Sequence, residues 1–304
     1  MATFKQIFDD LNLMSMAQLI PDDLKAIINR AAREEVEAWP WSTLLKVGVV
    51  WGLPAVTTGT VAATLDSPIV TASGANFPVD FPDYAPEENW VIKINNSLVA
   101  LAIESFDSAT QLTLTQPWKL ASAPLAAYEL YAQFTSVPNA LEVYAVRRWL
   151  DLAPVSRAVL NIRDPYRLQN AGNPAISFAT GGWDLSGNVR IEPWPRFSTA
   201  QAYAVEYRER WIKMIADADL CQIPASVVTN KATYYAFLGN FSSSGDARFA
   251  ALAEKFYNLY IEELEKARYE DERRQTTRNS GPVAVGYDIE SVTDLGGPPF
   301  GRQH

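Results

Sequence analysis

The stretch that decides the fold class reads TGTVAATLDSPIVTA over residues 58–72. It contains two short runs rich in β-branched and small apolar residues, separated by turn residues and without a helical period, which predicts two strands. Four further runs of this kind follow at 90–94, 98–103, 111–115 and 128–132. Asn95-Asn96-Ser97 is a predicted hairpin connection between the first two of these. Six short strands within residues 58–134 predict a small sandwich or barrel.

Helical patterns lie on both sides of this β region. Upstream, a proline and two aspartates at 21–23 suit a helix N-terminus, and apolar residues then recur at spacings of three and four. Pro40 disfavours the α conformation in the residue before it, so this helix should end near Trp39. Downstream, one helix is predicted from Pro224 to Gly239, and a longer one begins at Gly245-Asp246.

The far end of the longer helix, residues 262–278, is mostly charged. A helix whose last turns are polar all round is either solvated or packed against another chain. Between the β region and these helices the pattern is mixed. It predicts strands at 141–147, 175–178, 189–191 and 202–207 and a short helix at 155–162.

These elements predict an α+β fold with a helical bundle core, mixed β-strands, an inserted small all-β domain of sandwich or barrel type, and an extended C-terminal arm. The predicted domains are 1–57 (helical core, first part), 58–134 (inserted β domain), 135–275 (core, second part, strands then two long helices) and 276–304 (arm). With 304 residues, of which 48% are hydrophobic, the chain can bury a sizeable core. The same content of hydrophobic residues excludes disorder over long stretches of the chain.

The arm contains five glycines and three prolines and shows no period. Apolar residues are spaced along it, and we expect it to dock on a partner as an extended segment rather than to stay disordered. The predicted contact residues are Pro282, Tyr287, Ile289, Val292, Leu295 and Phe300.

Several residue counts exclude classes of function. The single histidine is His304, which lacks the neighbours that hold an imidazole in Ser-His-Asp or Cys-His catalysis. The single cysteine, Cys221, forbids an intramolecular disulfide and a cysteine-based zinc site, and we expect it to be a small buried apolar residue. Acidic residues outnumber basic ones 35 to 26, and the formal net charge is -9. No basic cluster is present of the kind that grips nucleic-acid phosphates.

The sequence also predicts a soluble protein made inside the cell. Its first residues lack the charged and then apolar regions of a signal peptide. No apolar run nears the roughly 18 residues that a membrane span needs. We therefore expect no membrane partner.

Candidate catalytic residues are limited to acidic pairs at 9–10, 22–23, 34–35 and at 217 and 219. Each pair has a structural interpretation: residues 22–23 lie in a first helical turn, and Glu34-Glu35 is expected on a solvated helix face. The pair at 217 and 219 lacks the other ligands of a calcium loop. Phosphate-binding glycine patterns are absent. We expect no catalytic residue, metal or cofactor.

Taken in chain order, these features resemble the head-to-tail adaptor proteins of short-tailed bacteriophages, the tail tubular protein A or head-completion type. The resemblance is carried by the helix before Trp39-Pro40-Trp41, the insert at 58–78, and Ile191-Glu192-Pro193-Trp194-Pro195. It continues through the strand with Tyr203 and Tyr207, Ile223-Pro224 and the terminal helix. It covers most of the chain, and the insert is larger than in some members.

The resemblance implies a non-enzymatic virion protein at the head–tail junction, made in the bacterial host cytoplasm. Copies would form a ring, usually a dodecamer, with a helical body. The arm would contact the portal protein, and the opposite face would receive the tail nozzle or tube protein. Viral DNA would pass through the ring without sequence-specific binding, which suits an acidic chain because like charges repel.

Two other functions remain open at this stage. The first is another virion ring or tail component with an immunoglobulin-like insert. The second is a carbohydrate-binding or carbohydrate-active protein, because nine tryptophans are present and such rings can stack on sugars. Several of them adjoin prolines, which favours packing. The carbohydrate function predicts that Trp90 or Trp118 is exposed near converging carboxylates, whereas the adaptor function predicts that both rings are packed.

Overall fold

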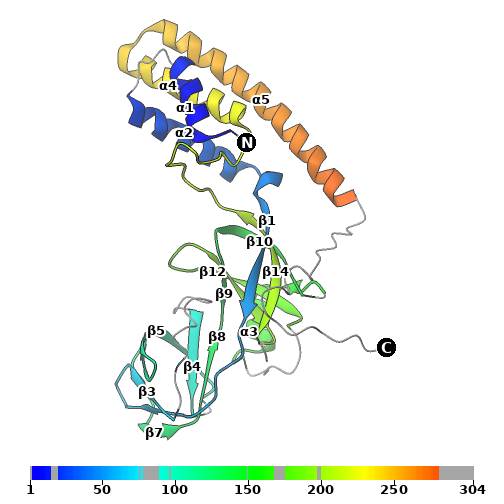
Figure 1. Cartoon of the computed structure of the whole chain (residues 1–304). Coiled ribbons are helices and arrows are strands. Elements are labelled where there is room, and N and C mark those ends of the chain that lie inside the picture. Colours follow the sequence, from blue (N-terminus) through cyan, green and yellow to red (C-terminus); the bar gives the residue numbers. More distant parts are fainter. Residues whose placement is uncertain are drawn as a thin grey trace. The chain divides into compact units, whose positions relative to one another are not determined.

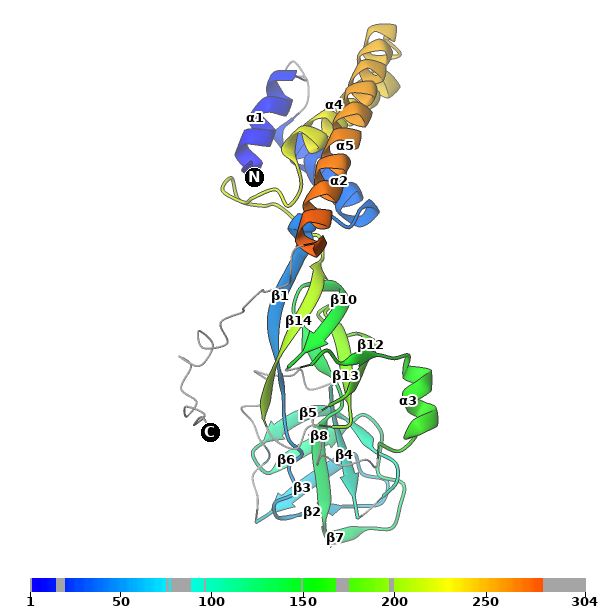
Figure 2. The same cartoon turned by 90° about the vertical axis from the view of Figure 1, so that its right-hand side faces the viewer.

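The computed structural model describes residues 2–14, 20–74, 77, 89–95, 97–148, 150–167, 175–196 and 200–280, with side chains only to Gln275 in the last helix. It combines helices with extensive antiparallel sheets, so the predicted α+β class is confirmed. The chain forms two compact units (Figures 1 and 2). The helical unit comprises Met1–Thr43 and Trp211–His304, and the β unit comprises Leu44–Arg210.

These units divide the chain at 43/44 and 210/211, whereas the sequence placed its domain boundaries at 57/58, 134/135 and 275/276. The difference arises from long-range strand pairing. Strand β1 (Leu45–Gly52) pairs along its length with β14 (Gln201–Glu209), which in turn pairs with β10 (Ala140–Arg147). Segments on both sides of the predicted insert therefore belong to the β unit.

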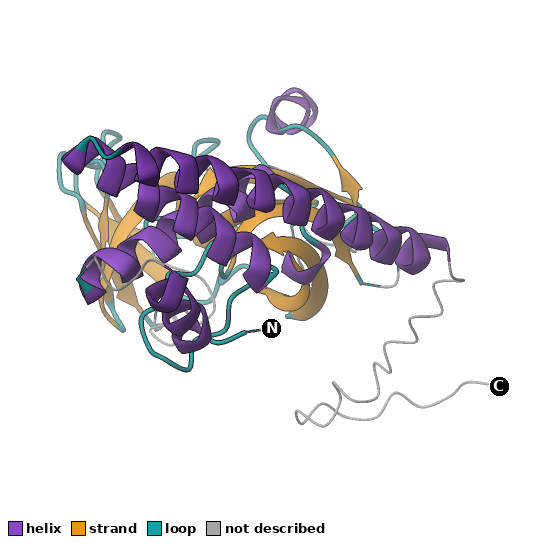
Figure 3. Ribbon diagram, turned by 90° about the horizontal axis from the view of Figure 1, so that it is seen from above, coloured by secondary structure: helices purple, strands orange, loops and turns teal. Residues whose placement is uncertain are grey.

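The helical unit consists of four described helices (Figure 3). They are α1 (Phe4–Met14), α2 (Pro21–Ala38), α4 (Ala225–Ser244) and α5 (Ala247–Ser280). Helix α4 is the central element, because α1, α2 and α5 all pack against it. Each helix contributes apolar side chains to the interior; the largest fully buried ones are Phe4, Ile7, Leu11, Leu24, Ile28 and Phe237.

Two glycines show how α4 ends. The sequence predicted an end at Gly239, and this prediction is wrong: the helix continues for five more residues, to Ser244. Its C-cap is Gly245, which has a φ of 70° in the left-handed region that favours glycine. The Gly245 N–H donates to the Phe241 carbonyl at 2.8 Å. Helix α5 then begins after only one further residue.

The β unit contains three described sheets. Strands β1, β14 and β10 form the first, in that order and all antiparallel. The second has the order β11-β12-β13-β9 and consists of β11 (Ala153–Pro154), β12 (Ser177–Trp183), β13 (Val189–Trp194) and β9 (Thr135–Val137). Helix α3 (Arg157–Arg163) follows β11 and contacts β12. One apolar core, which includes Val50, Phe178 and Tyr203, joins these two sheets.

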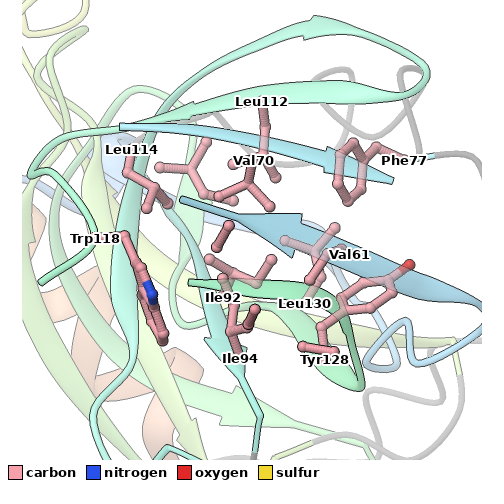
Figure 4. Close-up of a cluster of buried hydrophobic side chains, with 14 of the residues drawn as sticks. Val61, Val70, Phe77, Ile92, Ile94, Leu112, Leu114, Trp118, Tyr128 and Leu130 are labelled. Atoms are coloured by element: carbon pink, nitrogen blue, oxygen red, sulfur yellow. The ribbon is translucent and has the colours of Figure 1, made fainter. Parts of the chain in front are cut away.

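The third sheet has seven strands in the order β7-β2-β3-β6-β5-β4-β8 and curls as a half-barrel. The strands are β2 (Thr60–Ala63), β3 (Ile69–Ser73), β4 (Trp90–Ile94), β5 (Leu101–Ser108), β6 (Gln111–Leu114), β7 (Ala123–Ala126) and β8 (Tyr128–Ala132). Side chains such as Val61, Val70, Leu112 and Leu130 fill its concave side (Figure 4). Trp90 and Trp118 belong to this core and are 0% and 3% exposed.

Charged side chains join the seven-stranded sheet to the segments that follow α3 and β13. Lys93 on β4 donates to the Tyr166 carbonyl at 2.6 Å, and burial lowers the pKa of its ammonium group. Arg196 pairs with Glu129 on β8 at 2.9 Å and lies over the Tyr131 ring. Burial raises the pKa of that tyrosine to about 12. These contacts tie strands β4 and β8 to the segments after α3 and β13.

Candidate functional site

Helix α5 offers the most extensive candidate interaction surface of the described chain. It has 34 residues, about 50 Å at 1.5 Å per residue. The side chains of Ala253, Tyr260, Leu264 and Asp271 are buried, and their spacings of seven, four and seven place them on one face. The opposite face is exposed, and we call it the α5 face (Figure 2).

The α5 face carries charges of opposite sign at neighbouring positions. Three acidic residues are each followed directly by a basic one: Glu254-Lys255, Glu265-Lys266 and Glu272-Arg273. All six side chains are exposed. Neighbouring residues on a helix differ by about 100° in direction, and 18 residues make five whole turns. The acidic residues therefore form one straight stripe, and the basic residues form a second stripe beside it.

Ala251, Asn258, Glu262 and Tyr269 lie between the two stripes, and all four are exposed. We call this line of residues the seam. A shallow groove follows the first half of the helix along this seam; it is lined by Ala251, Glu254, Lys255, Asn258, Leu259 and Glu262. A second helix can approach most closely at Ala251, where the side chain is small. The α5 face therefore has the shape and the charges of a protein-binding surface.

The C-terminal half of α5 is fixed by Asp271, which is 3% exposed. Its carboxylate accepts hydrogen bonds from the Ser42 N–H at 3.0 and 3.1 Å, from the Ser42 hydroxyl and from Gln275 Nε2 at 2.9 Å. The Trp39 indole N–H also donates to it, at 3.4 Å. Arg268 covers the Trp39 ring at 4.9 Å. The segment after α2 is thereby bound to α5.

A small cavity lies beside Asp271, between α5 and the segments around Trp41 and Pro224. Its volume is about 150 Å³, below the roughly 300–1,000 Å³ that ligand pockets usually have. Much of its lining comes from charged residues of α5, including Glu263, Lys266 and Arg274. The cavity is too small to be a substrate site for a drug-sized molecule.

The middle of α5 is fixed by a buried ionic network. Oε1 of Glu35 on α2 accepts from Lys231 Nζ of α4 at 2.6 Å and from the Tyr260 hydroxyl of α5 at 2.7 Å. Lys231 Nζ also lies 2.9 Å from Glu34 Oε2. Burial and the hydrogen bond to Glu35 raise the pKa of Tyr260. The network joins three helices at one point, so α5 cannot slide along α2 and α4 without breaking it.

This network corrects the expectation that Glu34-Glu35 lies on a solvated helix face. Glu34 is partly exposed, but Glu35 is 2% exposed. Burial by itself would raise the pKa of Glu34, but hydrogen bonds from Tyr235, Lys231 and Arg30 outweigh burial and lower it to about 2. A carboxylate held ionised by three donors is a structural partner rather than a general acid.

The other acidic pairs have structural roles. Asp9 pairs with Lys5 at 3.2 Å within α1, and residues 22–23 lie in the first turn of α2. Oδ2 of Asp219 accepts from the N–H groups of Ile215 and Ala216 at 2.6 and 2.8 Å. Within the described ranges no group of three or more His, Cys, Asp or Glu side chains is placed to hold a metal ion. Cys221 is a free, buried thiol, as predicted, and burial raises its pKa.

A second exposed surface lies on β1, at one end of the three-stranded sheet. Val47, Val49 and Trp51 alternate along this strand and are 37%, 49% and 41% exposed. Ala204 and Ala202 lie opposite Val49 and Trp51 on β14. Exposed apolar side chains on an edge strand are typical of surfaces that another protein covers.

The predicted arm contacts Pro282, Tyr287, Ile289, Val292, Leu295 and Phe300 lie outside the described residues. Sequence reasoning did not identify the α5 face, although it noted the charged end of this helix. The signal was present as the three acidic–basic pairs, whose spacing of 11 and then 7 residues repeats after five turns.

None of the described helices is long and apolar enough to cross a lipid bilayer. No protein-family model matches the sequence, and no curated protein is significantly similar to it.

Proposed function

We propose that the protein is a head-to-tail adaptor of a short-tailed bacteriophage, a structural subunit without enzymatic activity. Copies of it form a ring beneath the portal protein and link the portal to the tail nozzle or tube protein. Viral DNA passes through the ring without sequence-specific contacts. The proposal starts from the resemblance of the sequence to this family, and three structural observations support it.

The burial of Trp90 and Trp118 is the observation that separates this function from the carbohydrate alternative. Both rings lie in the core of the seven-stranded sheet and are at most 3% exposed. A sugar stacks on an exposed ring, so neither tryptophan can serve as a platform. Trp183 is exposed, but the carboxylate next to it, Asp184, already accepts two hydrogen bonds from Asn188.

The second observation is the construction of the helical unit. It takes its helices from both ends of the chain, and the β unit is inserted between them. This arrangement matches a helical ring body that carries a separate β module. The third observation is the α5 face, which is long, exposed and held by two sets of buried contacts. A subunit of a ring needs a rigid surface of this kind for its neighbours.

Sedimentation of the purified protein with the portal protein of the same phage tests the proposal. We expect a discrete complex that contains several copies of the chain for each portal ring. A truncated chain without residues 281–304 should lose this binding and keep its thermal unfolding transition, because the predicted contacts lie in the arm. Absence of binding by the full chain at every ratio would contradict the adaptor function.

A matched control separates the apolar contacts of the arm from its length. The full chain with Tyr287, Ile289 and Phe300 replaced by serine keeps the length of the arm and removes three of its predicted contacts. We expect portal binding to weaken as much as in the truncated chain. Full binding by both variants would assign the portal contact to another surface.

A further inference from the structure

We propose that the α5 face binds the α5 face of a second copy of the same chain, with the two helices parallel and the acidic stripe of one copy against the basic stripe of the next. This inference does not depend on the proposed function. The pairing itself follows from the charges on the helix. The stripes are Glu254, Glu265 and Glu272 on one side and Lys255, Lys266 and Arg273 on the other.

The charge pattern identifies the partner as another copy of this chain. Each stripe has three charges, and each acidic residue lies next to a basic one, at the same height along the helix. A partner with charges of one sign would complement one stripe and repel the other. A second copy offers both signs with the same spacing, so the charges at positions 254, 255, 272 and 273 can find opposite charges, whereas Lys266 pairs with Glu262 within its own helix.

The same pattern determines the relative direction of the two helices. When two copies face each other with their helices antiparallel, the twofold axis places acidic stripe against acidic stripe. Like charges at close range are unfavourable. In the parallel arrangement, acidic and basic stripes meet. Both stripes of each copy then take part in one contact, which has a twofold axis parallel to the helices.

The buried contacts of α5 lower the cost of this association. The Asp271 contacts to Ser42 and the Glu35–Lys231–Tyr260 network already hold the helix in place. Little backbone freedom is then lost on binding. Exposed ion pairs are individually weak and are screened by salt. We therefore expect weak pairwise association that strengthens when many copies are gathered on a template, where effective concentration is high.

Two charge-reversal variants test the pairing. The first variant, Glu254→Lys with Glu272→Lys, makes both stripes basic at positions 254–255 and 272–273. The second variant, Lys255→Glu with Arg273→Glu, makes both stripes acidic at the same positions. Lys266 is left unchanged because it already pairs with Glu262 at 2.9 Å within the helix. Sedimentation velocity at high protein concentration compares about 20 mM with about 500 mM salt, across which screening increases strongly.

We expect the wild-type chain to associate at low salt and to dissociate at high salt. Each variant should sediment as a monomer, and an equimolar mixture of the two should associate again, with both variants in equal amounts. A single chain with all four reversals should regain self-association, because the two stripes have then exchanged their signs of charge at these four positions. A mixture that sediments as monomers at low salt would overturn the proposal, and so would self-association of either variant at the wild-type level.

The control variant Glu104→Lys with Asp217→Lys changes the net charge as the first variant does, at exposed positions outside α5. It should associate as the wild type does. Thermal unfolding of every variant checks that the fold is retained. Portal binding is a separate readout. If the wild-type chain binds the portal but the variant mixture stays monomeric, the adaptor function is supported and the α5 pairing is contradicted. If the variant mixture associates but the wild-type chain does not bind the portal, the pairing is supported and the adaptor function is contradicted.

Discussion

Lys231 Nζ lies 2.6 Å from Glu35 Oε1 in the interior of the helical unit, although 196 positions separate the two residues in the sequence. The two residues belong to different segments of the chain. Helix α2, which carries Glu35, precedes the β unit, and α4, which carries Lys231, follows it. The pair therefore joins the two segments of the chain that make up the helical unit.

Replacing Lys231 with methionine leaves the buried carboxylate of Glu35 without its nearest cation. We expect the free energy of unfolding to fall by about 3–5 kcal/mol, the range seen when one partner of a buried pair is removed. Urea denaturation followed by circular dichroism measures the change. The double variant Glu35→Leu with Lys231→Met removes both charges and should be more stable than Lys231→Met alone. Equal stability of the two variants would show that the buried charge is not the cause.

The stability of the helical unit should depend on pH through Glu34. Its pKa in the folded protein is about 2, below the usual value of 4.5. A lowered pKa means that the stabilising contribution is complete above about pH 4.5 and is lost as the pH falls toward 2. The difference in unfolding free energy between the wild type and Glu34→Gln should therefore shrink across this interval. Glu37→Gln is the control, and a constant difference for Glu34→Gln would contradict this prediction.

Trp118 should be essential to the seven-stranded sheet, because its ring is buried and its indole N–H donates to the Ala121 carbonyl at 3.0 Å. Trp118→Ala is expected to cost about 3–5 kcal/mol, as for other large-to-small changes in a core. Trp183→Ala is the matched control, because that ring is 51% exposed. Urea denaturation followed by tryptophan fluorescence measures both. Similar losses for the two variants would mean that burial does not determine the effect.

Asp271 should contribute to stability through the N–H group of Ser42. In Asp271→Ala both acceptor oxygens are removed, so the Ser42 N–H loses its partner. We expect a loss of about 1–3 kcal/mol in the free energy of unfolding. Glu270→Gln, at the exposed position before it, should change the thermal transition little. Hydrogen exchange of the Ser42 amide gives a local readout, and unchanged protection in Asp271→Ala would contradict the assignment.

The strand patterns predicted the seven-stranded sheet well, because period and turn residues are local signals. Five of its strands coincide with predicted runs to within two residues at either end. Strand β5 begins three residues and ends five residues later than predicted, at Leu101 and Ser108, and β7 was not predicted. Strand β7 contains Pro124, and a proline within a run weakens a strand pattern. Strand β1 was also missed, and it obtains its hydrogen bonds from β14, about 150 positions away in the sequence.

Helix α1 was not predicted, although the sequence contains a signal for it. The Thr3 N–H donates to Gln6 Oε1 at 2.9 Å, and the Gln6 N–H donates to Thr3 Oγ1 at 3.3 Å. This reciprocal pair is a capping box, which sequence inspection can find. The burial of Glu35 could not be found in this way, because its partner Lys231 comes close only in the folded unit.

The insertion of residues 44–210 between the two halves of the helical unit has a consequence during synthesis on the ribosome. Helices α1 and α2 leave the exit tunnel first, but α4, against which they pack, is encoded after the β unit. At about 5–20 residues per second, translation of the intervening segment takes on the order of 10–40 s. The β unit can fold in that time, whereas the first two helices have to wait with their apolar faces uncovered.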